Sequence, residues 1–311
     1  MKSLLIPLIG FLLFAATLPL TAGEFWLDLA EGEEIEEAKV IADLATAGVV
    51  YVGEAHTIAR HHALQLHLLQ ALAARGVPLV LCMEQLEARA QPLLDRYNRG
   101  EIDYDTLVRE SDWAKKWKNY LDYRPLCEFA HAHGIPLRAL NAPPEVIRAI
   151  SRGGGLAKLP PEQRATLPAE IVTDDPVYER MMNDQLAVHM AMDPAKLRPV
   201  FEAQVARDET MAVNIAAGRR DGAEGKPRTA FVIIGGGHVR YGHGTPSRLR
   251  RREPGIVERI VLMTESGQLV LSEADKAAAR EVTVSHASLR EIGRPPGDYL
   301  NVLPLAAAKS P

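Results

Sequence analysis

The chain has 311 residues, a formal net charge of −4 at pH 7 and a hydrophobic content of 47%. This length allows one large domain with an ample core, and the lack of a positive charge excess argues against nucleic acid as a partner. With only two cysteines, Cys82 and Cys127, no disulfide framework holds the fold, although a single bridge between them stays open.

The N-terminus has the pattern of a secretory signal peptide. Lys2 precedes an apolar run from Leu4 to Leu20, and the small residues of "TAG" provide a cleavage point after Ala22. We therefore predict a signal peptide over residues 1–22 and a periplasmic or secreted protein. An uncleaved membrane anchor is the alternative, but the run is short for a spanning helix. No cysteine lies near the cleavage point, so lipid attachment is not supported.

Apolar runs then alternate with amphipathic segments. Strands are predicted at Gly48–Val52, Pro78–Met83, Pro136–Leu140, Thr229–Ile234 and Ile256–Met263. Helices are predicted, from apolar residues at three-to-four spacing, at Ala59–Arg75, Leu121–His133 and Pro194–Ala217. This alternation predicts an α/β fold, with a mostly parallel sheet and helices on both of its faces.

The middle of the chain interrupts this alternation. The stretch from Ser151 to Pro168 is rich in glycine and proline and is flanked by helical patterns without strands. We interpret residues 143–217 as a helical insertion within a single domain of residues 23–311. After Met263, the segments "GQLVLSE" and "YLNVLPL" are expected to form short strands at the sheet edge.

Polar side chains follow three of the predicted strands at the point where each strand ends. "YVGEAH" carries Glu54 and His56, "LVLCMEQ" carries Glu84, and "FVIIGGGH" carries His238. Ligands of parallel sheets bind at the carboxyl ends of the strands, so these groups are expected to converge there. The spacing Gly-x-x-His occurs before both histidines, which favours a shared site over turn glycines with helix-capping histidines.

Two kinds of hydrolytic chemistry fit these side chains. His56, Glu84 and His238 resemble the two-histidine, one-carboxylate set that binds catalytic zinc, and Glu54 could then act as general base on a metal-bound water. In a metal-free version, a histidine and a glutamate activate water directly. Glu54, His56, Glu84 and His238 are therefore candidate catalytic residues. Of these, His56, Glu84 and His238 are also candidate metal ligands.

A second candidate site lies in the segment "DDPVYERMMNDQLAVHMAMD". At about 100° per residue, one helix face carries Tyr178, Met181, Met182, Gln185, His189 and Met192. This face could pack on the sheet as core, with methionine filling gaps. Alternatively, it forms an adaptable surface for planar, apolar haem, with Tyr178 or His189 as axial iron ligand. The candidate haem-binding residues are thus Tyr178, Met181, Met182 and His189.

The chain resembles the haem-binding uptake proteins of the ChaN type, a family grouped with the Tiki metalloproteases and the erythromycin esterases. The resemblance extends from about Val49 to about Thr264 and rests on "VGEAH", "CMEQ", "YLDYRPLCEFAHAHGIPLRALNAP", "AQVARDETMA" and "GGGH". It implies an ancestral active site, which the wider group builds from two Gly-x-x-His motifs and a strand-end glutamate. Carried over, these residues are Gly53, His56, Glu84, Gly235 and His238, with Glu54 alongside.

For the ChaN type, the resemblance implies haem as cofactor, bound through a tyrosine at the surface of a dimer, and a role in iron acquisition. Tyr178 is our choice of ligand because it lies on the methionine-bearing face, while Tyr104, Tyr120, Tyr123 and Tyr241 remain open. The implied partners are a second copy of the chain and haem-transport components of the outer membrane or periplasm. Relatives can be lipoproteins, but this chain has no cysteine that would serve.

The sequence therefore predicts a periplasmic haem-binding protein that serves haem or iron uptake or storage. An aromatic content of 5% fits a haem held between two subunits better than one in a deep pocket of a monomer. A metal-dependent hydrolase of the Tiki or esterase kind, using His56, Glu84 and His238, is the alternative.

Overall fold

The computed structural model describes residues 23–189, 194–220, 222, 225–265, 273 and 292–304. The predicted signal peptide, residues 1–22, lies outside them. Within this part of the chain, no helix is both long and apolar enough to cross a membrane. Cys82 and Cys127 are buried and free, so the bridge that the sequence left open is not formed.

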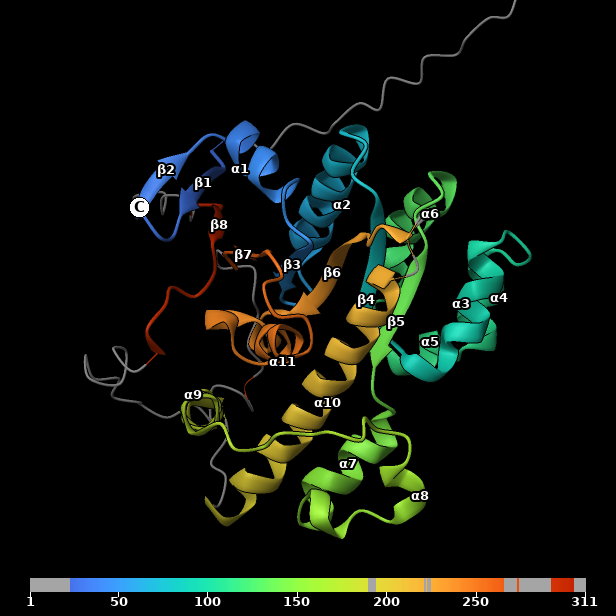
Figure 1. Ribbon diagram of the computed structural model, residues 1–311, viewed down its shortest axis with the longest axis vertical. Helices are drawn as coiled ribbons and strands as arrows, with labels where there is room; N and C mark the ends of the chain where they lie inside the picture. The colour runs from blue at the N-terminus through green and yellow to red at the C-terminus, as the bar shows by residue number, and fades with distance from the viewer. Residues whose placement is uncertain are drawn as a thin grey trace, which may run out of the picture.

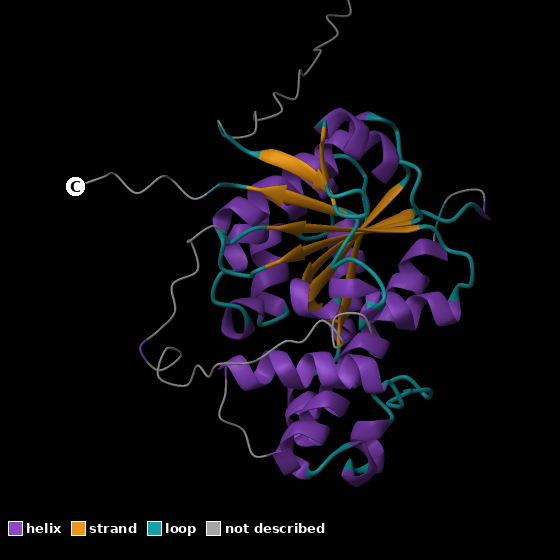
Figure 2. Cartoon of the chain, turned by 90° about the vertical axis from the view of Figure 1, so that its left-hand side faces the viewer, coloured by secondary structure: helices purple, strands orange, loops and turns teal. Residues whose placement is uncertain are grey.

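The described strands form one eight-stranded sheet in the order β2-β1-β8-β7-β3-β6-β4-β5. They are β1 (Phe25–Asp28), β2 (Glu33–Ile35), β3 (Val49–Glu54), β4 (Leu79–Glu87), β5 (Leu137–Asn141), β6 (Thr229–Gly235), β7 (Glu258–Met263) and β8 (Tyr299–Val302). From β8 to β5 all neighbours are parallel, whereas β1 pairs antiparallel with both β2 and β8. The predicted α/β class with a mostly parallel sheet is confirmed (Figure 2).

Helices cover both faces of this sheet (Figure 1). The α-helices are α1 (Glu37–Leu44), α2 (Ala59–Ala74), α3 (Gln91–Asn98), α4 (Tyr104–Glu110), α5 (Trp113–Lys116), α6 (Arg124–Ala132), α7 (Pro144–Gly153), α8 (Pro161–Arg164), α9 (Pro176–His189), α10 (Pro194–Arg220) and α11 (Thr245–Arg252). Helices α1, α2 and α6 pack on one face, and α10 and α11 pack on the other.

The alternation of side chains along β3 explains why both faces need cover. Val50 and Val52 join the core on the α2 side, whereas Val49 and Tyr51 join the core on the α10 side. All four side chains are fully buried. Four consecutive buried residues of this kind are typical of parallel sheets with helices on both faces.

The segment predicted as an insertion contains helices only. Between β5 and β6, the described residues form α7, α8, α9 and α10, and the first half of α10 packs with α7 and α9 below the sheet (Figures 1 and 2). The second half of α10 differs from the prediction, because Met211 and Ile215 pack directly on the sheet strands. This part of the helix belongs to the main α/β layer.

The tail strand does not lie where the sequence analysis placed it. Tyr299–Val302 forms β8, but β8 lies inside the sheet, between β7 and β1. The reason is the β1–β2 hairpin near the N-terminus, which was not predicted and which extends the sheet beyond β8. The other predicted tail strand, "GQLVLSE", falls almost entirely outside the described residues.

Candidate functional site

Three neighbouring strands bring the predicted polar residues to one edge of the sheet. Strand β6 lies between β3 and β4. Glu54 is the last residue of β3, Glu84 lies in β4, and His238 ends the short 3-10 helix η5 (Gly236–His238) that follows β6. Because these strands are parallel, their carboxyl ends meet, and the structure places the two glutamates, His56 and His238 around one another.

Glycine is needed at these strand ends because other groups approach the backbone closely. A Cβ atom on Gly235 would lie 3.0 Å from Cε1 of His56 and 3.4 Å from Oε2 of Glu84. A Cβ atom on Gly53 would lie 2.9 Å from Cδ2 of Leu262. Gly235 has an ordinary φ of −61°, so close packing, and not backbone conformation, accounts for this glycine.

Glu54 is a buried carboxylate with many hydrogen-bond donors. Gln65 Nε2 donates to Oε2 at 2.6 Å, while Gln85 Nε2 and the Tyr123 hydroxyl donate to Oε1 at 2.8 and 2.6 Å. His56 Nδ1 lies 2.8 Å from the same Oε1. Sequence analysis did not assign these two glutamines to the site, and it considered Tyr123 only as an open haem ligand.

Two histidines set the charge state of Glu54. Nδ1 of His56 lies 2.8 Å from this carboxylate and Nδ1 of His62 lies 3.4 Å from it. Burial alone would raise the pKa of Glu54, but the hydrogen bonds of His56 and His62 outweigh burial and lower it below its usual range. Burial lowers the pKa of each histidine in turn, and Glu54 more than offsets that, so both pKa values are raised.

His56 combines one fixed nitrogen with one free nitrogen. Its side chain is 35% exposed, and its ring packs edge-on against Trp117 with centroids 4.8 Å apart. When Nδ1 carries the proton toward Glu54, Nε2 has a lone pair, and Nε2 has no hydrogen-bond partner among the described residues. A histidine held this way can accept or donate a proton at Nε2.

His238 is enclosed between two carboxylates. Nδ1 lies 2.6 Å from Oδ1 of Asp208 and Nε2 lies 3.4 Å from Oε1 of Glu84. Burial alone would lower the pKa of His238, but Glu84 and Asp208 outweigh burial and raise it to about 9. Burial would raise the pKa of Glu84, but His238 outweighs that effect and lowers it to about 2. At neutral pH, His238 is therefore positively charged and Glu84 is negatively charged.

Asp208, on α10, is a site residue that the sequence analysis missed. It is fully buried, and besides His238 it accepts hydrogen bonds from the Tyr178 hydroxyl and from Thr245 Oγ1, each at 2.9 Å. The segment "AQVARDETMA" was quoted for its family resemblance, but no role was given to its aspartate. One signal in the sequence could have indicated this residue. Asp208 is a carboxylate in a segment with alanines and other apolar residues, and a carboxylate buried with them needs a partner.

The methionine-bearing face packs inward at the positions the structure describes. Tyr178 is 3% exposed and Met182 is 9% exposed, and both pack with Phe201 and Val205. Met181 is half-buried, and the side chain of His189 lies outside the described residues. The core interpretation therefore holds for Tyr178 and Met182, which do not form an exposed surface.

Tyr178 is also unsuited to bind iron in this arrangement. Its hydroxyl donates to Asp208 Oδ2 at 2.9 Å inside the protein. Burial, aided by the charge of Asp208, raises the pKa of Tyr178 well above its usual value, which disfavours the phenolate that would ligate ferric iron. The burial of Tyr178 and its hydrogen bond to Asp208 therefore argue against the choice of Tyr178 as haem ligand.

The proposed zinc ligands do not form a metal site. Across the residues that the structure describes, no group of three or more His, Cys, Asp or Glu side chains could hold a metal ion. His56 turns Nδ1 to Glu54, and His238 turns its two nitrogens to Asp208 and Glu84. The carboxylates thus stabilise protonated histidine in places where zinc would need neutral imidazole.

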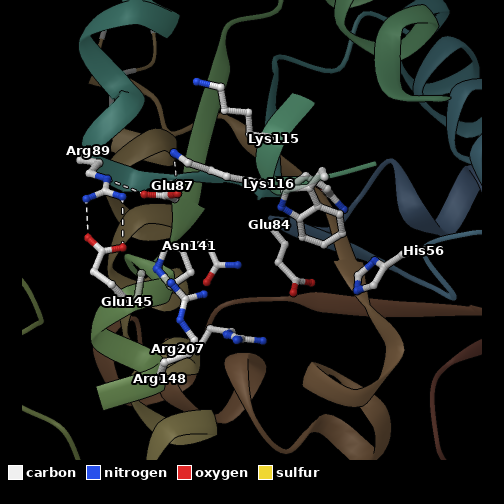
Figure 3. Close-up of a pocket in the computed structure, with 14 residues that line it drawn as sticks. His56, Glu84, Glu87, Arg89, Lys115, Lys116, Asn141, Glu145, Arg148 and Arg207 are labelled. Atoms are coloured by element: carbon white, nitrogen blue, oxygen red, sulfur yellow. Dashed lines mark hydrogen bonds and ion pairs between the residues drawn. The ribbon is translucent and has the colours of Figure 1, made fainter. Parts of the chain in front are cut away.

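A pocket of about 540 Å³ opens beside these strand ends. His56 and Glu84 line one side of it, and an ion pair between Arg89 and Glu145 lies on the opposite side (Figure 3). Trp117, which packs against the His56 ring, also lines the pocket. Its volume is within the range of sites for small organic ligands. Most of its lining side chains are polar or charged, and Trp117 is the aromatic residue among them.

Comparison with known proteins defines the class. The family model described as "Haem-binding uptake, Tiki superfamily, ChaN" matches residues 40–249, which is more than half of the chain. The chain therefore belongs to the ChaN family of haem-binding uptake proteins within the Tiki superfamily, as the sequence resemblance predicted.

A solved structure of this family agrees with the chain at the level of the fold. ChaN of Campylobacter jejuni, described with cofacial haem binding, matches with a TM-score of 0.66 and 16% identity, covering 90% of this chain and 97% of that chain. A variant of the erythromycin esterase EreC in its open conformation matches with a TM-score of 0.47 and 10% identity, covering 92% and 98% of the two chains. No curated protein matches the sequence.

Proposed function

We propose that this protein binds haem and serves haem or iron uptake outside the cytoplasm. The observation that carries the proposal is the match to the haem-binding family over residues 40–249. The similar fold of the Campylobacter jejuni protein, whose title describes cofacial haem binding, supports it. The signal-peptide pattern of residues 1–22 supports export to the periplasm or beyond. A homodimer and haem-transport partners belong to the same proposal.

The burial of each tyrosine side chain indicates which tyrosine binds iron. Of the eight tyrosines, the six that are buried are Tyr51, Tyr97, Tyr104, Tyr123, Tyr178 and Tyr299. Tyr120 and Tyr241 are half-buried and so are the two that can reach an external haem. Tyr241 has left-handed backbone angles (φ 58°, ψ 17°), which are uncommon for a non-glycine residue and cluster at functional sites. We therefore assign the iron ligand to Tyr241.

Charges beside Tyr241 suit the two propionates of haem. Arg240 precedes this tyrosine and Arg294 packs over Gly242, and both arginine side chains are exposed. Among the described residues, neither arginine has a carboxylate within 4.0 Å. Guanidinium groups pair well with carboxylates. A phenolate at Tyr241 would bind ferric iron, and the two arginines would hold the propionates.

A haem titration of the mature protein tests this function. The wild type should show saturable binding with a ferric, tyrosine-ligated absorption spectrum. Tyr241→Phe should bind haem at least about tenfold more weakly, equivalent to about 1.4 kcal/mol, and should lose that spectrum. Tyr120→Phe and Tyr178→Phe are the matched controls, because each removes one hydroxyl elsewhere. Absence of saturable binding by the wild type would refute the proposal.

Two further results bear on the finer statements. Loss of the spectrum in Tyr120→Phe, with Tyr241→Phe unchanged, would move the ligand to Tyr120. Analytical ultracentrifugation that shows a monomer with haem fully bound would exclude the dimer. A metal-dependent hydrolase is not favoured, because the family is haem-binding and the described residues hold no zinc site.

A further inference from the structure

The pocket at the strand ends has cations that its own acids do not neutralise. On one wall, Arg89 lies 2.5 Å from a carboxylate oxygen of Glu87 and 2.5 Å from one of Glu145. Lys116 Nζ lies 2.7 Å from the other oxygen of Glu87. These four side chains satisfy one another and leave no charge for a ligand.

Two arginines of the pocket stand outside this network. Arg148 of α7 and Arg207 of α10 line the pocket, and among the described residues neither has a carboxylate within 4.0 Å. Figure 3 shows them between the Glu84 and His56 side and the Arg89–Glu145 pair. The charge of Glu84 interacts with that of Arg207, but this carboxylate is already engaged, since its Oε2 accepts from Gly235 N at 2.6 Å and its Oε1 faces His238.

Unsatisfied polar atoms line the same space. Nε of Arg207 is buried without a hydrogen-bond partner, and so are Oδ1 of Asn141 and Oε1 of Gln85. All three residues line the pocket. Buried polar atoms in proteins are nearly always paired, because an unpaired one destabilises the fold. Residues that line one pocket and carry unpaired donors and acceptors suit a polar ligand.

We propose that this pocket binds a small organic molecule through a carboxylate held by Arg207 and Arg148. Arginine binds carboxylates with two parallel hydrogen bonds, which suits a planar anion. The polar remainder of the ligand then faces Asn141, Gln85 and the free Nε2 of His56. The carboxylate comes from a free organic acid or from a haem propionate that binds here in place of the Arg240 and Arg294 site, and the experiment distinguishes these sources.

The first arm of the experiment measures succinate binding by calorimetry on the haem-free mature protein at low ionic strength. Wild type should bind succinate saturably, and Arg207→Gln should bind at least about tenfold more weakly. Arg148 is an exposed side chain on α7, and Arg148→Gln should also weaken succinate binding. This variant serves as the test if Arg207→Gln does not fold. Arg152→Gln, on the same helix but outside the pocket lining, should bind like wild type.

The second arm titrates haem into the same variants. Loss of succinate binding with unchanged haem binding identifies a free organic acid as the source. Weaker haem binding in Arg207→Gln, but not in Arg152→Gln, identifies a propionate. No succinate binding by wild type together with unchanged haem binding in Arg207→Gln overturns the proposal, and so does clear preference for inorganic phosphate over succinate. If wild type binds succinate but not haem, the haem function fails and the pocket stands.

Discussion

The two Gly-x-x-His strand ends share a sequence pattern but differ in environment. After β3, His56 has a side chain that is 35% exposed, one carboxylate partner and a free nitrogen toward the pocket. After β6, His238 has a side chain that is 7% exposed and lies between two carboxylates. The motif places a histidine at the sheet edge, and residues from other elements decide whether that histidine can exchange a proton with a ligand.

Removing the histidines should separate these environments most strongly. His238→Ala leaves Asp208 and Glu84 buried without their shared cation, so we expect the free energy of unfolding to fall by about 3–5 kcal/mol. His56→Ala leaves Glu54 with its other donors, so a loss of about 1.5 kcal/mol is expected. Urea unfolding of both variants at pH 7 measures the difference. Equal losses of stability would contradict the distinction between His238, which is enclosed by two carboxylates, and His56, which has a free nitrogen.

The pH dependence of stability should reveal the triad around His238. The pKa of His238 is about 9 in the folded protein and near 6.5 in an unfolded chain. Folding therefore favours the protonated form, and this contribution is fully present below about pH 6.5 and lost as the pH rises through about 9. Glu84 has the opposite sign, since its pKa falls from 4.5 to about 2. Its contribution is present above about pH 4.5 and lost as the pH falls through about 2.

Unfolding free energies measured between pH 6 and 10 check the first of these windows. Wild type should lose stability across this range, whereas His238→Gln, which cannot be protonated, should not show the same decline. His133→Gln, which changes an exposed histidine at the end of α6, should keep the wild-type slope. A decline of the same size in His238→Gln would show that another group is responsible.

Gly235 lies where His56 and Glu84 pack against the backbone, so a methyl group added at this position should disturb both side chains. In Gly235→Ala the new Cβ would meet the His56 ring at 3.0 Å, and overpacking of this kind costs about 1–3 kcal/mol. Gly237→Ala is a close control, because no atom lies within 4 Å of a Cβ at that position. Thermal unfolding of both variants provides the comparison. An alanine at Gly235 that is as well tolerated as one at Gly237 would mean that His56 moves freely.

The strand-end residues could be found from sequence because their position follows from local pattern. Buried parallel strands have continuous apolar runs, and a polar residue directly after such a run must lie at the carboxyl edge. This reasoning located Glu54, His56, Glu84 and His238. It could not locate Asp208, because the contact between α10 and η5 depends on how a 27-residue helix crosses the sheet.

The face of α9 shows the second limit of the sequence. Helical periodicity correctly groups Tyr178 with Met182, but periodicity does not state whether a face turns to the core or to solvent. Packing against Phe201 and Val205 of α10 turns these two residues inward. Tyr241 illustrates the converse case, since nothing in its local pattern marks a half-buried tyrosine with left-handed backbone angles.

The smallest expected effects come from two hydroxyl groups, one in each environment. Tyr123 donates to Glu54 at 2.6 Å and Tyr178 donates to Asp208 at 2.9 Å. Each Tyr→Phe change removes one hydrogen bond to a charged group and should cost about 1.5 kcal/mol. In addition, Tyr123→Phe removes a hydrogen-bond donor from Glu54, so the carboxylate interacts more strongly with His56 and the pKa of His56 should rise. Tyr178→Phe should leave the His56 titration unchanged.

Nuclear magnetic resonance titration of His56 and urea unfolding of the two single variants and the double variant test this last expectation. If Glu54 and Asp208 organise separate networks, the losses in the double variant should add within about 0.5 kcal/mol. A larger interaction energy, or a shift of the His56 titration in Tyr178→Phe, would mean that the networks act as one. The triad of His238, Asp208 and Glu84 would then influence proton exchange at His56, and the two Gly-x-x-His motifs would belong to one hydrogen-bond network.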